Sequence, residues 1–100
     1  MRPIHIAKLG TKPRPVLVLT REIARPVLNT VTAAPITSTI RNIPTEVRLD
    51  SSNGLDHDCV ALLDKITTIP TDALGRRVGN LHPGQEQCLT DAIHAAFELK

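Results

Sequence analysis

The sequence contains no tryptophan and no tyrosine, and Phe97 is the only aromatic residue among its 100 residues. Common folds that bind single-stranded nucleic acid stack the bases on Phe, Tyr or Trp side chains, so a stacking surface of that kind is excluded. Any contact with RNA must therefore use hydrogen bonds and charge. The apolar residues are mostly Val, Ile, Leu and Ala, which predicts an aliphatic core.

Cysteine is scarce as well, and Cys59 and Cys88 each lie in apolar surroundings without the spacing of a zinc site or a redox pair. We expect two buried free thiols. No apolar run approaches the length of a membrane span, and no long hydrophobic region follows Met1. A cytoplasmic protein without a membrane partner is the expectation.

Several enzyme motifs are also missing. The sequence has no Gly-x-Ser-x-Gly elbow, no phosphate loop ending in Gly-Lys-Ser/Thr and no His-Glu-x-x-His helix, so classical hydrolases and nucleotide enzymes are not indicated. Asp56-His57-Asp58 has the residue types of a metal site, but it follows an Asn-Gly turn, where acids commonly cap loops. We favour the turn and expect no metal and no cofactor. His5, His82 and His94 have no evident partner in the sequence and are expected at core edges or helix ends.

Charge is unevenly distributed along the chain. Residues 1–48 hold eight Lys/Arg and two Glu, a net charge of +6, whereas residues 49–100 hold four Lys/Arg and eight acids, a net charge of −4. A basic half suits a polyanionic ligand, and an acidic half suits a basic partner or self-association. Solvated surface charge explains such an asymmetry equally well.

Short apolar runs bounded by turn residues predict a mainly β fold in a single domain over residues 1–100. Strands are expected over 4–9, 15–20, 31–36, 45–49, 59–66 and 76–81. Capped helical turns are expected at 21–24, after Thr20, and at 71–74. A terminal helix should begin near Pro83, with His82 as a cap, and bury one face made of Leu89, Ala92, Ile93, Ala96 and Phe97. This pattern is typical of a small, strongly curved β-barrel or two-sheet roll covered by a C-terminal helix.

The stretch Val31–Arg41 carries the most informative polar residues. An apolar strand there ends in the hydroxyls of Thr37, Ser38 and Thr39, which is common where chemistry occurs but also in ordinary turns. Lys12 and Arg14 precede the strand at 15–20, and Asp64 interrupts the run at 59–66. These residues form the candidate constellation.

Four segments make the chain recognisable: Lys-Pro-Arg-Pro-Val-Leu-Val-Leu-Thr at 12–20, Ala-Pro-Ile-Thr-Ser-Thr-Ile-Arg at 34–41, Pro-Thr-Glu-Val at 44–47 and Leu-Gly-Arg-Arg-Val-Gly at 74–79. Together they resemble the MazF/PemK toxin family, in order and over nearly the whole chain. The short opening Arg-Pro-Ile-His-Ile is most similar to the short mycobacterial members.

The resemblance implies a type II toxin on a small SH3-like, CcdB-like β-barrel of the α+β class with a C-terminal helix. It implies a homodimer that a cognate MazE-like antitoxin inhibits. It also implies a sequence-specific, metal-independent endoribonuclease, an mRNA interferase that blocks translation and growth. In that family the 2′-hydroxyl of single-stranded RNA attacks the adjacent phosphate and leaves a 2′,3′-cyclic phosphate and a 5′-hydroxyl. Messenger, ribosomal and transfer RNA all stay open as targets.

Individual positions match the family's functional residues to different degrees. Arg14 matches the catalytic arginine, and Thr37 matches the catalytic threonine. Asp64 matches an acid that some members use in proton transfer or substrate binding, although an ion pair at the barrel rim fits it equally well. Leu62 stands where the PemK/Kid branch places a catalytic arginine, so the acid-base scheme of that branch does not carry over.

The remaining expected contacts are with RNA. Ser38, Thr39 and Arg41 are expected to contact phosphates or bases, and Lys12 is expected to bind the backbone. The usual Gly-acid-Ile-Trp opening is absent and the loop before Arg14 is short. The loop therefore lacks the family's Glu, and the substrate-gating role of that loop does not carry over.

Two alternatives to a nuclease stay open. A CcdB-like gyrase poison would share the fold without nuclease activity, but that family depends on an aromatic C-terminal tail, and this chain ends Phe-Glu-Leu-Lys without Trp. An RNA-binding barrel or structural adaptor without activity would fit the fold and the charge.

Overall fold

A computed structural model describes residues 2–20 and 29–98. Within these residues the elements are the strands β1 (Pro3–Leu9), β2 (Lys12–Val18), β3 (Thr30–Thr37), β4 (Glu46–Leu49), β5 (Cys59–Leu62), β6 (Thr67–Pro70) and β7 (Leu74–Asn80), short 3-10 turns, and the helix α1 (Glu86–Phe97). None of the described helices is long and apolar enough to cross a membrane. The helical turn expected at 21–24 lies outside the described residues.

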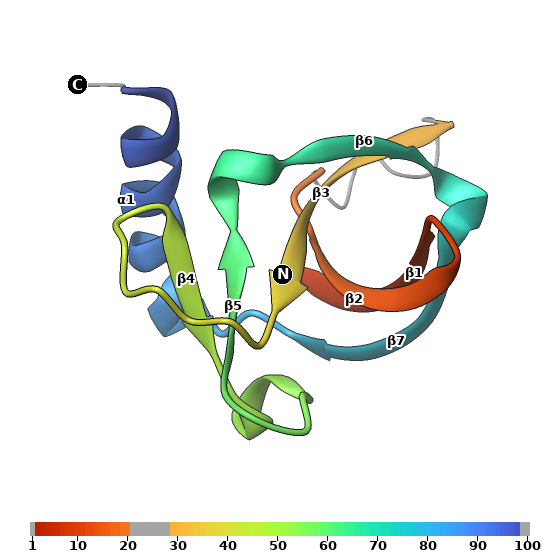
Figure 1. The fold of residues 1–100 in the computed structure, drawn as a ribbon, viewed down its shortest axis with the longest axis horizontal. Helices are drawn as coiled ribbons and strands as arrows, with labels where there is room; N and C mark the ends of the chain where they lie inside the picture. Colours follow the sequence, from red (N-terminus) through yellow and green to blue (C-terminus); the bar gives the residue numbers. More distant parts are fainter. Residues whose placement is uncertain (1, 21–28, 99–100) are drawn as a thin grey trace.

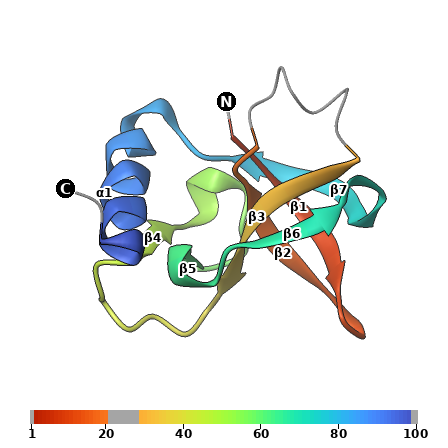
Figure 2. The same ribbon diagram turned by 90° about the horizontal axis from the view of Figure 1, so that it is seen from above.

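The strands form one curled antiparallel sheet in the order β4-β5-β3-β2-β1-β7, and β6 pairs with β3 beside this path. Figure 1 shows β1, β2, β7, β3 and β6 curving around a half-barrel, while β4, β5 and α1 lie together on its other side. Figure 2 shows α1 standing against β4 and β5, away from the curl. The expected mainly β architecture with a C-terminal helix is confirmed.

The unbroken apolar run of β2 arises because both faces of this strand are buried. Val16 and Val18 point into the half-barrel with Val31, Ala33 and other aliphatic residues. Leu17 points the other way, into the larger core that Leu89 of α1 closes. A strand covered on both faces reads as a continuous apolar run, so the expectation from the sequence is explained.

The pairing of β1 with β7 is irregular. The register between these strands shifts between Ile4 and His5 and again between His5 and Ala7. An extra residue on one strand of an antiparallel pair increases the local twist and bends that strand. These irregularities lie where the edge strand β7 pairs with β1.

The loop between β4 and β5 is fixed by a buried amide and a close backbone crossing. Asn53 is 1% exposed, and its side-chain nitrogen donates to the carbonyl of Asn80, at 2.9 Å, and to Oε1 of Gln85, at 2.7 Å. Gly54 has a φ of 92°, and a Cβ on it would lie 2.0 Å from the carbonyl oxygen of Val78. A Cβ on Gly79 would lie 1.7 Å from the carbonyl oxygen of Asn53. Only glycines allow the loop and β7 to approach this closely.

Asp50 begins this loop as the N-cap of a 3-10 turn over Ser51–Asn53. Hydrogen bonds from the side chain and the backbone of Ser52 hold the pKa of Asp50 below its usual value of 3.8. The ionised carboxylate therefore stabilises the loop fully when the pH is above 3.8, the usual pKa of Asp. This stabilisation is lost as the pH falls through the lowered pKa of Asp50.

Several expectations from the sequence are wrong. Asp64 does not interrupt a strand, because β5 ends at Leu62 and Asp64 lies in a 3-10 turn over Leu63–Lys65. Phe97 is 53% exposed rather than part of the buried helix face. Cys88 is exposed, so Cys59 alone of the two thiols is buried.

Other expectations need a smaller correction. β6 was not expected, since only Ile69 within it is buried. The turn at Thr71–Ala73 forms, but as a 3-10 turn without a side-chain cap. His5 and His82 do have partners, because Nδ1 of His5 lies 2.9 Å from the carbonyl oxygen of Gly75 and Nε2 of His82 lies 3.1 Å from Oγ of Ser52.

The crossing of the loop and β7 gives a matched pair of variants. Gly79→Ala should lower the free energy of unfolding by about 3 kcal/mol, because its Cβ would lie 1.7 Å from the backbone carbonyl oxygen of Asn53. Gly84→Ala should change it by less than about 0.5 kcal/mol, because nothing lies within 4 Å of that Cβ. Urea unfolding of both variants measures the difference, and equal stabilities would contradict the crossing.

Candidate active site

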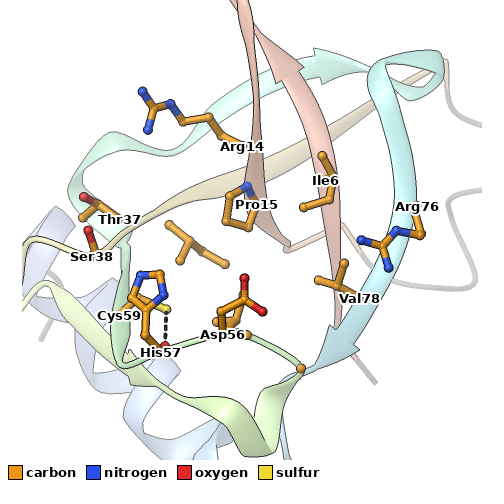
Figure 3. A pocket seen from close by; sticks show the side chains of 13 residues that line it. Ile6, Arg14, Pro15, Thr37, Ser38, Asp56, His57, Cys59, Arg76 and Val78 are labelled. Carbon is orange, nitrogen blue, oxygen red and sulfur yellow. Dashed lines mark hydrogen bonds between the residues drawn. The ribbon is translucent and has the colours of Figure 1, made fainter.

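A cavity of 420 Å³ opens where β2 and β3 meet the loop after β4 and the strand β7. Figure 3 shows the side chains that these separate segments place around the cavity, with Asp56 and Arg76 directed into it and Arg14 at its rim. The lining residues are Ile6, Arg14, Pro15, Ile36, Thr37, Ser38, Gly54, Leu55, Asp56, His57, Cys59, Arg76 and Val78. Aliphatic side chains and the ring of Pro15 form part of the wall, and polar side chains from distant parts of the sequence form the rest.

Arg14 and Thr37 meet at this cavity because of the register between β2 and β3. The antiparallel pairing runs from Val18 opposite Ala33 to Val16 opposite Pro35. Two more residues in the same register place Arg14 opposite Thr37. Side chains two residues apart share a face of a strand, so both point to the same side, and both line the cavity. The structure thus brings together the two residues that the sequence singled out.

The hydroxyl of Thr37 is fixed by the chain that follows it. Thr37 is the last residue of β3 and pairs with Val60 of β5, which holds its backbone. Its Oγ1 accepts a hydrogen bond from the backbone N–H of Thr39 at 3.2 Å. An oxygen that accepts from the backbone keeps its own hydrogen free to donate. The hydroxyl is therefore a positioned donor at the cavity.

The guanidinium of Arg14 is free to bind an anion. The sequence predicted Arg14 just before a strand at 15–20, but β2 already begins at Lys12, so Arg14 is its third residue. The side chain of Arg14 is exposed. Within residues 2–20 and 29–98, no hydrogen bond or ion pair engages it. A planar guanidinium presents donors that match two oxygens of one phosphate, so it can hold such a group in a fixed orientation.

The other expected site residues divide into two groups. Ser38 lines the cavity next to Thr37, whereas Lys12, Thr39, Arg41 and Asp64 do not. Lys12 lies two residues from Arg14 on β2, so the two side chains share a face. The backbone N–H of Arg41 donates to the carboxylate of Glu46 at 3.1 Å, and its exposed guanidinium extends from that anchored loop.

Three polar residues at the cavity were not expected from the sequence. Asp56 and His57 were interpreted as part of a capped turn, but Asp50 is the residue that caps it. Arg76 lies in β7, within the Leu-Gly-Arg-Arg-Val-Gly segment that supported the family resemblance. Nothing local in the sequence indicates that its side chain lines the cavity. Across the described residues, no group of three or more His, Cys, Asp or Glu could hold a metal ion.

Cys59 lines the cavity, but its burial lowers the reactivity of the thiol. The residue is 3% exposed, and its Sγ donates to the carbonyl oxygen of His57 at 3.5 Å. Burial, with a smaller contribution from the charge of Asp58, raises the pKa of the thiol above its usual value of 9.0. At neutral pH the group is therefore a protonated thiol rather than a nucleophile.

Residues 4–97 match the family described as the PemK-like, MazF-like toxin of type II toxin-antitoxin systems. The chain belongs to this toxin family. It is a homologue of endoribonuclease MazF3 of Mycobacterium tuberculosis, with 54% identity over 99 residues that cover 99% of this chain and 95% of that protein. A probable endoribonuclease MazF2 of the same organism is 38% identical over 80 residues, which cover 77% of this chain and 78% of that protein.

Solved structures support the same assignment. The Mycobacterium tuberculosis toxin MazF-mt6 superposes on this toxin with a TM-score of 0.95 at 52% identity, covering 99% of each chain. A mycobacterial endoribonuclease in complex with its cognate antitoxin gives a TM-score of 0.86 at 26% identity, covering 98% of this chain and 93% of that one. The resemblance inferred from the four sequence segments is thus confirmed at the level of family and fold.

The environments of the two thiols of this MazF-like toxin predict different reactivities. At pH 8, iodoacetamide should modify exposed Cys88 at least about tenfold faster than Cys59, because burial and the raised pKa leave little accessible thiolate at Cys59. Mass spectrometry of peptides from the native protein measures both rates. Unfolding in urea should equalise them, and equal rates in the native protein would contradict the buried position of Cys59.

Proposed function

We propose that this toxin cleaves single-stranded RNA as a sequence-specific endoribonuclease that needs no metal ion, and that Arg14 and Thr37 are its catalytic residues. The observation that carries the proposal is their meeting at one cavity, where Arg14 has a free guanidinium and Thr37 a hydroxyl fixed by a backbone hydrogen bond. Homology to the endoribonuclease MazF3 supports the substrate class. The toxin acts in the cytoplasm as an mRNA interferase and blocks translation and growth.

The proposed chemistry needs no nucleophile from the protein. The 2′-hydroxyl of the RNA loses its proton, and its oxygen forms a bond to the adjacent phosphorus. The bond from phosphorus to the 5′-oxygen breaks, and that oxygen takes a proton and leaves as a 5′-hydroxyl. The other product ends in a 2′,3′-cyclic phosphate. Negative charge builds up on the non-bridging oxygens during this step, so groups that bind those oxygens lower the barrier.

Arg14 and Thr37 suit that requirement in different ways. The guanidinium of Arg14 supplies positive charge and two parallel donors for the phosphate oxygens. The hydroxyl of Thr37 supplies a neutral donor in a fixed direction, because Thr39 already occupies one of its acceptor positions. Removal of one preorganised donor at such an oxyanion typically lowers the rate by about 10²–10³-fold.

The surrounding residues position the strand rather than cleave it. Ser38, Thr39 and Arg41 continue from Thr37 and form hydrogen bonds to phosphates or bases, while Lys12 binds the backbone beside Arg14. Asp64 is the exception, because it lies outside the cavity, in the turn after β5, and serves either in substrate binding or in proton transfer. Contacts made by the cations add affinity that depends on salt.

RNA cleavage should be measurable with purified protein and single-stranded RNA in EDTA. The wild type should produce fragments with 5′-hydroxyl ends, which polynucleotide kinase can label without prior phosphatase treatment. Arg14→Ala and Thr37→Ala should each lower the rate by about 10²-fold or more, and Arg14→Lys should restore little because it lacks the planar pair of donors.

Matched controls come from residues outside the cavity. Arg48→Ala removes an exposed arginine 4.0 Å from Asp58, and Thr90→Ala removes a helix hydroxyl that donates to the carbonyl of Glu86. Neither should change the rate appreciably. Intact RNA after incubation with the wild type, or full activity in Arg14→Ala, would overturn the nuclease proposal.

We also propose a symmetric homodimer that a MazE-like antitoxin inhibits. The mycobacterial relative with a TM-score of 0.86 forms a complex with its cognate antitoxin. The split between a basic first half and an acidic second half favours association through unlike charges. Light scattering at micromolar concentration should give a mass of twice the 10.9 kDa chain. A stable monomeric mass would contradict the dimer.

A further inference from the structure

The cavity contains charged groups that the proposed cleavage step does not use. Asp56 lies in the loop before β5, and Arg76 lies on β7, opposite the side from which Arg14 approaches. Figure 3 shows the carboxylate of Asp56 directed into the cavity, with Arg76 reaching in from β7 and the strand that carries Arg14 on the other side. No hydrogen bond or ion pair among the described residues engages either Asp56 or Arg76. Both are therefore available to a ligand.

The carboxylate of Asp56 is unsuited to the RNA backbone. Phosphates carry negative charge, and an ionised carboxylate offers only hydrogen-bond acceptors, so a phosphate at this position would be repelled. The two arginines at the sides of the cavity suit phosphates instead. A strand held by Arg14 and Arg76 would present the base between them, rather than its backbone, to Asp56.

The walls of the cavity suit the faces of such a base. Ile6, Pro15 and Val78 line it with apolar surface, which can cover a planar ring in a chain without aromatic stacking residues. The volume of 420 Å³ lies within the range of pockets that bind small organic ligands. The cavity therefore combines apolar walls, one acceptor group and flanking cations.

We propose that this cavity binds the base next to the scissile phosphate and that Asp56 selects a base with an exocyclic amino group over uracil. Adenine, cytosine and guanine each present an amino donor that a carboxylate accepts. Uracil has a carbonyl oxygen where cytosine carries its amino group, and a carboxylate that faces this position is repelled. Its N3–H donor lies between two carbonyl oxygens, so a carboxylate that reaches it also meets these acceptors. Arg76 holds the phosphate on the far side of that nucleotide. This inference rests on the proposed ribonuclease function and assigns part of its specificity.

The test compares cleavage of a randomised single-stranded RNA library in EDTA by the wild type and by Asp56→Asn. Sequencing of the 5′ ends should show that the wild type excludes uracil at one position beside the cut. Asp56→Asn should raise cleavage at uracil there by about tenfold or more, because the amide offers a donor to the uracil oxygen. Preferences at other positions should not change.

Asp58→Asn is the matched control. It makes the same change of charge two residues away, at an exposed side chain that lies 4.0 Å from Arg48 and does not line the cavity. Its cleavage pattern should equal that of the wild type. A pattern of Asp56→Asn identical to the wild type, or an equal loss of rate at every sequence, would overturn the assignment of Asp56 while leaving the ribonuclease function in place. Absence of cleavage by the wild type would overturn both.

A binding measurement checks the same assignment without cleavage. Oligonucleotides with a 2′-deoxyribose at the cut site and a single base exchange should bind the wild type about tenfold more weakly when the selected base is uracil. Asp56→Asn should remove that difference, and Asp58→Asn should keep it. Equal affinities of the wild type for all four bases would overturn the selection by Asp56.

Discussion

The pairing of β2 with β3 is the constraint on which the rest of the structure depends. Val16, Leu17 and Val18 lie opposite Pro35, Ala34 and Ala33, and this short ladder separates the half-barrel interior from the core under α1. A slip of one residue would turn every side chain on β2 to the wrong core. The same register, continued by two residues, fixes Arg14 across from Thr37. Stability and the candidate active site are therefore set by one alignment of two strands, and the site inherits the rigidity of a doubly buried ladder.

The second wall of the site depends on a different contact. Gly54 and Gly79 let the loop after β4 contact the backbone of β7. The buried amide of Asn53 also donates a hydrogen bond to the side chain of Gln85, directly before α1. This crossing brings Asp56 and Arg76 to the same cavity, although they are separated by 20 positions in the sequence. The cavity thus has one wall held by strand pairing and one held by a glycine crossing. Both are mainly backbone contacts, so they leave the side chains of Arg14, Asp56 and Arg76 available to a ligand.

The sequence predicted those parts of the structure whose signals are local. β2 carries a continuous apolar run, β3 carries one that only Thr32 interrupts, and the loop around Asn53 and Gly54 carries the favoured turn pair, so these strands and the turn were expected. Arg14 and Thr37 were candidates from their places beside apolar strands, but their catalytic roles were expected only through the family resemblance, because nothing local reveals the register that joins them. β6 was missed because a strand with one buried side chain lacks an alternating apolar pattern.

Asp56 and Arg76 were missed for a related reason. The crossing of Gly54 with Gly79 is a long-range contact, and each glycine alone reads as an ordinary turn or a weak position in a strand. Phe97 was placed on the buried face of the helix by its spacing, but the apolar surface under α1 is already covered by Leu89, Ala92 and their neighbours. Helical periodicity gives the direction of a face and not its width.

The lack of aromatic residues acquires a physical meaning in this cavity. A protein that stacks bases on aromatic rings gains affinity for every base alike, since each base has a π-face. Aliphatic walls such as Ile6 and Val78 provide weaker and equally unselective contact, so selective recognition there would rely on hydroxyl and charged groups that act on the edges of a base and on its phosphates. Carboxylate and guanidinium groups do so with opposite preferences. In a chain with one phenylalanine, the proposed RNA site would use both signs of charge, and Asp56, Arg14 and Arg76 all line the same cavity.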